Sequence, residues 1–269
     1  DGGLDEWLTA VYETAVFVIE NNQWQFAHDK LREAVLADIP PTHLPQHHAT
    51  VATAIEQLYP GQSDQAAILA HHWQQAGNHT REYTSRYQAA QFASQQYAYQ
   101  DALGHLTRAI ATATTNDELF QTLLLQEQAW EILGNEPARE ASLARLAELA
   151  QHVQQPEAKV LVAQRQAERA ERQGNSTLSV AHARQTIAEA QKINYEAGIA
   201  AGYALLGNAL IRLGEHAAAE ETTRQSLERY LKLENHMGVG KAHISLGMIA
   251  YYQAQHIQAE QQFQAALAS

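Results

Sequence analysis

The sequence predicts an all-α fold built from successive helical hairpins. Residues 200–266 contain one pattern written twice: residues 203–207 (YALLG) return forty residues later as residues 243–247 (HISLG). A fixed period of this length is typical of a repeat architecture. Ala and Gln are abundant, Leu and Glu are frequent, and Pro occurs only 6 times, which favours helix. No apolar run approaches the roughly 20 residues that a membrane-spanning helix needs.

Composition excludes several classes of function. The chain has 269 residues and no Cys, so it has no disulfide framework, thiol nucleophile or thiolate metal site, and we expect a cytoplasmic protein. The net charge of -12 repels phosphate backbones, so direct binding of nucleic acid is not expected. The chain lacks an initiator Met and ends inside a repeat-like segment, and we therefore expect a fragment of a longer protein.

The repeat can be placed in five units that start near residues 83, 120, 160, 200 and 240. Position eight of each unit falls on Ala90, Glu127, Ala167, Gly207 and Gly247, and position twenty on Ala102, Arg139, Ser179, Ala219 and Ala259. Small residues at both positions let the two helices of a hairpin approach closely, whereas the second unit departs from this rule. Turns are expected at Gly134, Gly174, Gly214 and Ala254. The pattern resembles the tetratricopeptide (TPR) repeat, whose helical hairpins stack into a superhelix.

The first forty residues do not fit the repeat. Residues 4–12 read as an amphipathic helix, and two short apolar runs, 15–19 and 23–26, flank Asn21-Asn22 as in a β-hairpin. A further helix follows, with Asp29 placed to cap it, and ends before Pro40. Helix, hairpin and helix in this order suggest the end of a winged-helix module.

Two segments carry a more specific resemblance. Residues 26–35 (FAHDKLREAV) resemble the segment that closes the winged-helix module of STAND-type signalling ATPases, and residues 69–78 (LAHHWQQAGN) resemble the helix that leads into their repeats. The resemblance implies that residues 1–40 end a winged-helix module, 41–80 form a helical linker pair and 81–269 form the repeats. The two linker helices are expected at 46–58 and 64–75. Val51, Ile55 and Leu58 would form the apolar face of the first.

Segments that could carry chemistry have plainer interpretations. Gly238-Val-Gly240-Lys241 lacks the Ser or Thr and the glycine spacing of a phosphate-binding loop. Histidines cluster at His43, His47 and His48 and at His71 and His72, but Pro45 interrupts the first cluster and no carboxylate companion is spaced as a metal site requires. We therefore expect no cofactor, no metal and no catalysis by this chain.

A binding surface is expected on the first helix of each hairpin, which lines the concave face of such superhelices. The inward candidates are Tyr87, Gln91, Leu124, Gln128, Gln164, Glu168, Arg172, Asn208, Arg212, Ile244, Met248, Tyr251 and Tyr252. Leu206-Gly207-Asn208 resembles the Leu-Gly-Asn of peptide-binding TPR proteins, in which the Asn bonds the peptide backbone. Tyr251, Tyr252 and Met248 are either anchors for a ligand or surface covered by a further repeat.

Charge pairs leave one further alternative open. Arg165, Arg169 and Arg172 form a stripe on one helix face, interleaved with Glu168 and Glu171. The stripe is either a solvated face with internal ion pairs or a contact for an acidic partner.

The resulting hypothesis is a recognition role. The repeats would bind a protein, a peptide or a small inducer in the groove, and, by the resemblance, couple it to an upstream NTPase domain of a bacterial transcription regulator. The alternatives are a free-standing TPR adaptor, a DNA-binding regulator that uses the winged helix, and an enzyme with a histidine metal centre. No contact with a membrane is expected.

Overall fold

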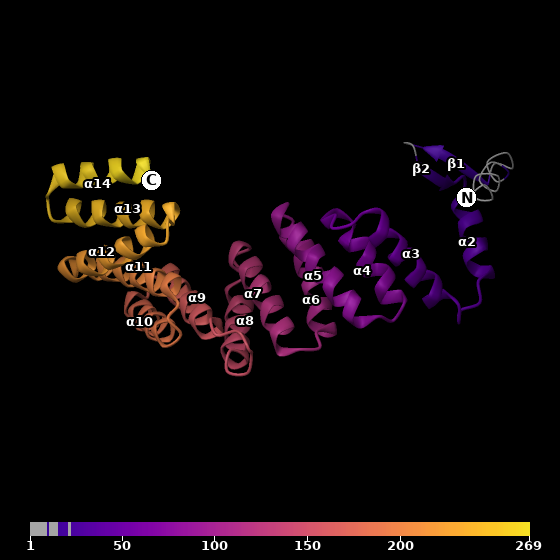
Figure 1. The fold of residues 1–269 in the computed structure, drawn as a ribbon, viewed down its shortest axis with the longest axis horizontal. Coiled ribbons are helices and arrows are strands. Elements are labelled where there is room, and N and C mark those ends of the chain that lie inside the picture. The colour runs from indigo at the N-terminus through magenta and orange to yellow at the C-terminus, as the bar shows by residue number, and fades with distance from the viewer. Residues whose placement is uncertain (1–9, 11–15, 21–22) are drawn as a thin grey trace. The chain divides into compact units, whose positions relative to one another are not determined.

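The computed structural model describes residues 10, 16–20 and 23–269. The chain divides into two compact units, residues 1–92 and 93–269, which are described separately. The expected helix at 4–12 lies outside the described residues, apart from Ala10, which is helical. Figure 1 labels the elements along the chain.

The first unit begins with the expected hairpin. Strands β1 (Phe17–Glu20) and β2 (Gln23–Phe26) pair antiparallel, with Phe17 opposite Phe26 and Glu20 opposite Gln23. Helix α2 (Asp29–Asp38) follows, and its N-cap is His28 rather than Asp29. Asp29 is the first helical residue, where its charge favours the positive end of the helix dipole, so the predicted capping role was wrong.

The linker pair is present, with shifted limits. Helix α3 (Leu44–Leu58) begins two residues before the expected position, because Pro45 lies in its first turn, where a missing N–H costs nothing. Pro45 therefore does not interrupt the histidine segment, contrary to the prediction. A short 3-10 turn, η1 (Ser63–Gln65), precedes α4 (Ala66–Gln75), and Gly77 ends this helix in the left-handed conformation.

The core between α3 and α4 uses a different face of α3 from the one predicted. Ala52, Leu69 and Trp73 are buried there, with Ile55 partly buried against them. Val51 and Leu58 are 43% and 71% exposed. The small side chain of Ala52 leaves room for the Trp73 ring to pack against α3. The buried face of α3 therefore includes an alanine, which a pattern of large apolar residues does not indicate.

The helices of the repeats follow in alternation. The first helices of the five repeats are α5 (His79–Gln95), most of which belongs to the compact unit 1–92, and then α7 (Asn116–Ile132), α9 (Ala158–Arg172), α11 (Glu196–Leu213) and α13 (His236–Tyr252). The second helices are α6 (Tyr99–Thr112), α8 (Glu136–Leu149), α10 (Ser176–Lys192), α12 (His216–Lys232) and α14 (His256–Ala268). Each first helix starts two to four residues before the predicted start of its unit, but the register within the units holds.

Residues at positions eight and twenty of every unit are buried, as the register predicted. Where position eight is a glycine, the helices lie so close that a single added methyl group would clash. A Cβ on Gly207 would lie 2.4 Å from the hydroxyl oxygen of Thr223, and one on Gly247 2.6 Å from the Phe263 ring. In the third unit the Ser179 hydroxyl donates to the backbone carbonyl of Ala167 at 3.2 Å.

In the second repeat, positions eight and twenty are occupied by charged residues instead of small ones. Glu127 and Arg139 are both 0% exposed, and the Arg139 Nε donates to the Glu127 carboxylate at 2.6 Å. Arg139 also lies 3.5 Å from Glu131 and 3.6 Å from Glu136. A buried ion pair thus takes the place of the close backbone contact of the neighbouring hairpins.

Turns recur at the expected places. Gly134, Gly174 and Gly214 all have left-handed backbone conformations after the first helix of their hairpins. Ala254 adopts the same conformation, with φ of 59°, although it has a side chain. No helix among the described residues is both long enough and apolar enough to cross a membrane.

Candidate binding cleft

A ladder of ion pairs connects the inner faces of successive first helices. Arg172 of α9 pairs with Glu131 of α7, and Arg212 of α11 pairs with Glu171 of α9 at 3.5 Å. In each case position thirteen of one unit meets position twelve of the preceding unit. In the fifth unit position thirteen is Tyr252, so an aromatic residue ends the ladder.

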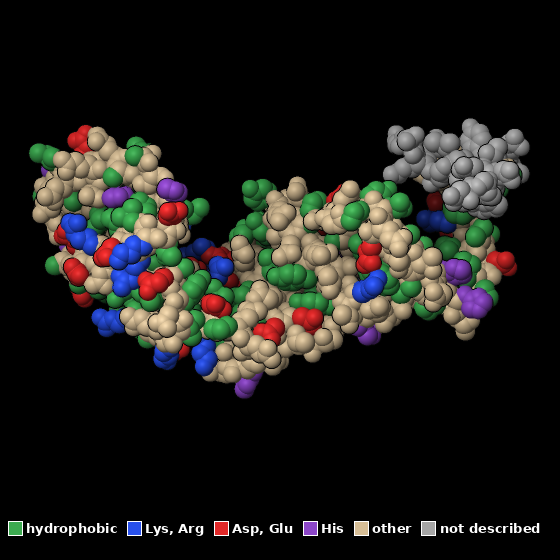
Figure 2. Space-filling view, in the orientation of Figure 1, with side chains coloured by type: hydrophobic (Ala, Val, Ile, Leu, Met, Phe, Trp, Pro, Cys, Tyr) green, Lys and Arg blue, Asp and Glu red, His purple; other side chains and the backbone are tan. Residues whose placement is uncertain are grey.

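The Arg stripe on α9 is engaged within the protein. Arg165 lies 3.8 Å from Glu127 and 3.6 Å from Glu131, and Arg169 bonds Glu136 at 3.1 Å. All three arginines therefore tie α9 to the preceding hairpin, which favours the internal-pairing alternative. Figure 2 shows Lys and Arg side chains intermixed with Asp and Glu side chains over the region of α11 and α12 as well.

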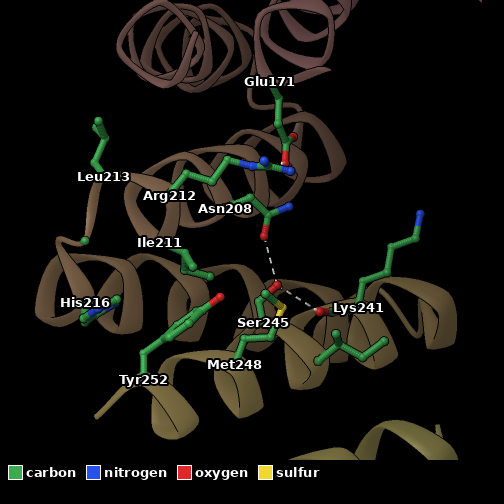
Figure 3. Close-up of a pocket in the computed structure, with 12 residues that line it drawn as sticks. Glu171, Asn208, Ile211, Arg212, Leu213, His216, Lys241, Ser245, Met248 and Tyr252 are labelled. Atoms are coloured by element: carbon green, nitrogen blue, oxygen red, sulfur yellow. Dashed lines mark hydrogen bonds and ion pairs between the residues drawn. The ribbon is translucent and has the colours of Figure 1, made fainter. Parts of the chain in front are cut away.

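A cleft of about 780 Å³ opens where the ladder ends, between α11 and α13 and next to Glu171 of α9 (Figure 3). Its volume lies in the range of ligand pockets in general, about 300–1,000 Å³. The lining residues combine apolar, aromatic and charged groups and are Glu171, Asn208, Ile211, Arg212, Leu213, Gly214, His216, Lys241, Ile244, Ser245, Met248 and Tyr252.

One wall of the cleft offers hydrogen-bond donors. Ser245 places its hydroxyl oxygen 2.9 Å from the Asn208 amide oxygen and 3.2 Å from the Lys241 backbone carbonyl, and its single proton can be donated fully to only one of them. The Asn208 amide oxygen accepts from Ser245, and the Asn208 amide nitrogen has no hydrogen-bond partner among the described residues. Arg212 extends past Asn208 towards Glu171.

The other wall is apolar and aromatic. Ile244 and Met248 lie one turn apart on α13 and are 47% and 39% exposed. The Tyr252 ring stacks on His216 of α12, with ring centroids 5.4 Å apart and planes at 16°. This stacking fixes the ring at the edge of the cleft.

The structure brings five of the predicted groove residues together in this cleft: Asn208, Arg212, Ile244, Met248 and Tyr252. Tyr251 does not line it and makes an edge contact with His256. Gln164 donates to Glu168 at 3.1 Å and Leu124 is partly buried against the core around Phe120, so these side chains are occupied within the protein. Gln128 is exposed elsewhere on α7.

Tyr87 and Gln91, the two predicted groove residues of the first repeat, lie on α5. Burial raises the pKa of the Tyr87 hydroxyl, and a hydrogen bond with Gln91 acts in the opposite direction. Tyr87 also stacks on Tyr83, with centroids 6.2 Å apart.

Sequence reasoning missed the contributions of Glu171, Lys241 and Ser245. Lys241 and Ser245 occupy positions two and six of the fifth repeat and Glu171 occupies position twelve of the third, and the period alone does not show that these positions line one cleft. The groove residues predicted from the sequence lie at positions five, nine, twelve and thirteen of their repeats, so Lys241 and Ser245 fell outside the prediction. Gly238 to Lys241 form the first turns of α13, where the Asn235 side chain accepts from the Gly238 N–H at 2.8 Å, so this segment is helix rather than a phosphate loop.

The histidines of α3 and α4 meet one another. The Nδ1 atoms of His48 and His72 lie 2.9 Å apart, and His71 packs edge-on against both rings. Burial, followed by repulsion from neighbouring histidines, lowers the pKa of both His48 and His72. Among the residues that the structure describes, no three His, Asp or Glu side chains are arranged to hold a metal ion.

Comparison with solved structures decides the fold. BtubC (BKLC) from P. vanneervenii aligns with a TM-score of 0.53 at 12% identity, covering 86% of this chain and 91% of its own. The apo form of RapI aligns with a TM-score of 0.61 at 12% identity, covering 84% and 72%. A STAND protein with a tetratricopeptide repeat sensor from Pyrococcus horikoshii aligns with a TM-score of 0.60 at 12% identity and covers 96% of this chain.

The fold is a TPR-type helical repeat. This confirms the fold class predicted from the forty-residue period. The chain spans 45% of the length of the Pyrococcus STAND protein. No protein-family model and no curated protein matches the sequence.

Proposed function

We propose that this chain is a non-catalytic recognition module that binds a peptide or a protein segment in the cleft between α11 and α13. The observation that carries the proposal is the cleft itself, which lies on the inner helices of the repeat and combines an unpaired amide donor with exposed apolar side chains. Protein partners suit a surface of this kind, because TPR-type superhelices use their inner face for binding.

Binding of selected peptides tests the proposal. Peptides are selected from a random library against the purified chain and titrated by fluorescence anisotropy against the wild type and Met248→Asp. The matched control is Ile257→Asp, because Ile257 is 76% exposed on α14 and does not line the cleft. We expect the cleft substitution to weaken binding about tenfold or more, and the control to leave it unchanged. Selected peptides that bind both variants alike would contradict the proposal.

We further propose that the chain is the sensor region of a STAND-type regulatory ATPase in the cytoplasm, coupled to an NTPase domain upstream. The support is the resemblance of residues 26–35 and 69–78 to such proteins, together with the alignment of 96% of this chain to a STAND protein of known structure. The test compares ATP hydrolysis by the parent chain with and without Met248→Asp, in the presence of a selected peptide. Equal rates in both would contradict the coupling, and ATP turnover by residues 1–269 alone would contradict the non-catalytic role.

A further inference from the structure

Helices α3 and α4 of the first unit meet through a cluster of three histidines. The Nδ1 atoms of His48 on α3 and His72 on α4 lie 2.9 Å apart, and both rings are partly buried. His71 is the third member, with its ring centroid 5.9 Å from that of His48 and 5.5 Å from that of His72. Three groups with an ordinary pKa of 6.5 therefore lie at one contact between two helices.

The contact between His48 and His72 accepts one proton between its two nitrogen atoms and not two. A neutral imidazole has one nitrogen that donates and one that accepts, so the 2.9 Å contact is a hydrogen bond when only one Nδ1 carries a proton. When both rings are charged, both Nδ1 atoms carry a proton and neither can accept. Charging both rings therefore replaces a hydrogen bond by two N–H groups that face each other.

The carboxylates around the cluster have other partners. Glu56 on α3 pairs with Arg81 on α5 at 3.0 Å, Glu82 on α5 lies 3.6 Å from His79, and Asp64 of η1 accepts from its neighbour in sequence at 3.3 Å. Among the residues that the structure describes, no carboxylate pairs with any of the three histidines. The groups that can be charged near neutral pH on α3, η1, α4 and α5, besides the cluster, are His43, His47, Glu56, Asp64, His79, Arg81, Glu82 and Arg86.

The folded contact binds protons less readily than free histidines do. Burial, followed by repulsion from neighbouring histidines, lowers the pKa of His48 and of His72 below 6.5. Well above pH 6.5 the histidines are neutral whether the helices are in contact or separated, so they do not change the equilibrium. As the pH falls below 6.5, the separated helices take up protons first and are favoured. Acidification therefore weakens the contact between α3 and α4.

The core that opposes this separation is small. Trp73 follows His72 directly, is 3% exposed, and packs with Ala52 and Leu69 between the two helices. Its indole N–H donates to Glu56 of α3 at 3.0 Å. Because the stabilisation from apolar burial grows with the area buried, a core with so few large side chains is sensitive to repulsion at its edge.

We propose that the histidine cluster is a proton-sensitive switch that holds α4 against α3 in its neutral form and releases it when His48 and His72 are both charged. Release takes Trp73 out of its core and opens the helical pair that precedes the repeats. The proposal concerns residues 44–75 of the first unit and does not depend on the peptide cleft, so the two proposals fail separately.

Hydrogen exchange followed by mass spectrometry tests the switch in the whole 269-residue chain at pH 7.5, 6.5 and 5.5. Labelling times are adjusted so that an unfolded chain exchanges to the same extent at each pH, and a chelator in every buffer keeps trace metal off the histidines. We expect peptides from residues 44–75 to exchange about tenfold faster at pH 5.5 than at pH 7.5. Peptides from α11 and α12 of the second unit serve as the internal reference and should not change.

Variants show whether the histidines cause the change. His48→Gln/His72→Gln keeps side chains that can bond each other but cannot take up a proton, so exchange of residues 44–75 should no longer depend on pH. His48→Lys places a permanent charge at the contact, and exchange should be fast already at pH 7.5. His182→Gln is the matched control, because it removes a histidine of α10 outside the cluster, and its response to pH should equal that of the wild type.

Three results would overturn the switch. They are unchanged exchange of residues 44–75 between pH 7.5 and 5.5, equal acceleration in both units, and a pH response of the double Gln variant equal to that of the wild type. If circular dichroism shows that the double variant does not fold, His72→Gln alone takes its place. This variant leaves His48 without a histidine at Nδ1 and should respond to pH more weakly than the wild type, and an equal response would overturn the switch.

Discussion

Glu127 and Arg139 are joined by a 2.6 Å hydrogen bond across the second hairpin of the repeat, and neither side chain is exposed to solvent. They occupy positions eight and twenty, where the fourth hairpin has Gly207 and Ala219. The two charges are therefore not a flaw in the repeat but a different solution to the same packing problem. Arg165 lies 3.8 Å from Glu127 and connects this pair to the next hairpin.

We predict that Glu127→Ala will lower the free energy of unfolding by about 3–5 kcal/mol, because it leaves the buried Arg139 guanidinium without its closest partner. The double variant Glu127→Leu/Arg139→Met, which fills the site with apolar groups of similar size, should cost far less than the single one. Urea denaturation followed by circular dichroism measures both. If the double variant were less stable than Glu127→Ala, the ion pair would stabilise the fold by more than the cost of burying its two charges.

The close helix contact at Gly207 gives a second prediction. Gly207→Ala should destabilise the chain by about 1–3 kcal/mol, because the new Cβ would lie 2.4 Å from the buried Thr223 hydroxyl oxygen. Thr223 has no hydrogen-bond partner among the described residues, so adding Thr223→Ala should restore much of the lost stability. Gly104→Ala is the control: its Cβ would meet nothing within 4 Å on α6, and it should raise stability by up to about 1 kcal/mol. Equal thermal midpoints for the two glycine variants would contradict the steric explanation.

The left-handed turn at Ala254 gives a third prediction. Ala254 has φ of 59° where the preceding hairpin has Gly214 at 78°. Ala254→Gly should therefore stabilise the chain, by about 0.5–1 kcal/mol once the greater freedom of unfolded glycine is subtracted from the relieved strain. Gly214→Ala should have the opposite effect, since nothing lies within 4 Å of its Cβ position and only the backbone conformation changes. Thermal unfolding of the two variants compares them directly. If both variants shifted the thermal midpoint in the same direction, the left-handed backbone conformation would not be the cause of the change in stability.

The sequence predicted the repeat well because its signal is steric and periodic. Gly207 and Gly247 could be recognised forty residues apart, and both lie at close helix contacts in the structure. The pairing of Glu127 with Arg139 was not predicted, since the pattern specifies size at these positions and does not show that two opposite charges can bury each other.

The cleft was only partly predictable. Asn208 and Met248 were predicted from the register: both occupy position nine of their repeats, and both line the cleft. Lys241 and Glu171 did not, since their role depends on how consecutive hairpins are offset, and a period along the chain carries no information on that offset. The buried face of α3 was mispredicted for a related reason. Trp73 packs on the small Ala52, and the sizes of the residues along α3 do not show which of its faces a bulky side chain of another helix will contact.

The fourth prediction concerns acid stability at the start of α7. The Thr115 hydroxyl accepts from the Glu118 N–H at 3.1 Å, and the Glu118 carboxylate accepts from the N–H groups of Thr114 and Thr115 at 2.7 and 3.1 Å, a complete capping box. Burial acts to raise the pKa of Glu118, but the hydrogen bonds from Thr114 and Thr115 outweigh it and hold the pKa below its ordinary value.

A carboxyl group with a lowered folded pKa stabilises the protein above its unfolded pKa and loses this contribution as the pH falls through the folded one. Glu118→Gln should therefore be less stable than the wild type at pH 7, and the difference should shrink as the pH falls below the ordinary value of 4.5. Thr115→Ala, which removes the other half of the box without removing a titrating group, should cost about 1 kcal/mol at pH 7. Urea unfolding at several pH values between 7 and 3 provides the comparison. A difference between wild type and Glu118→Gln that stays constant over this range would show that the charge of Glu118 does not stabilise the start of α7.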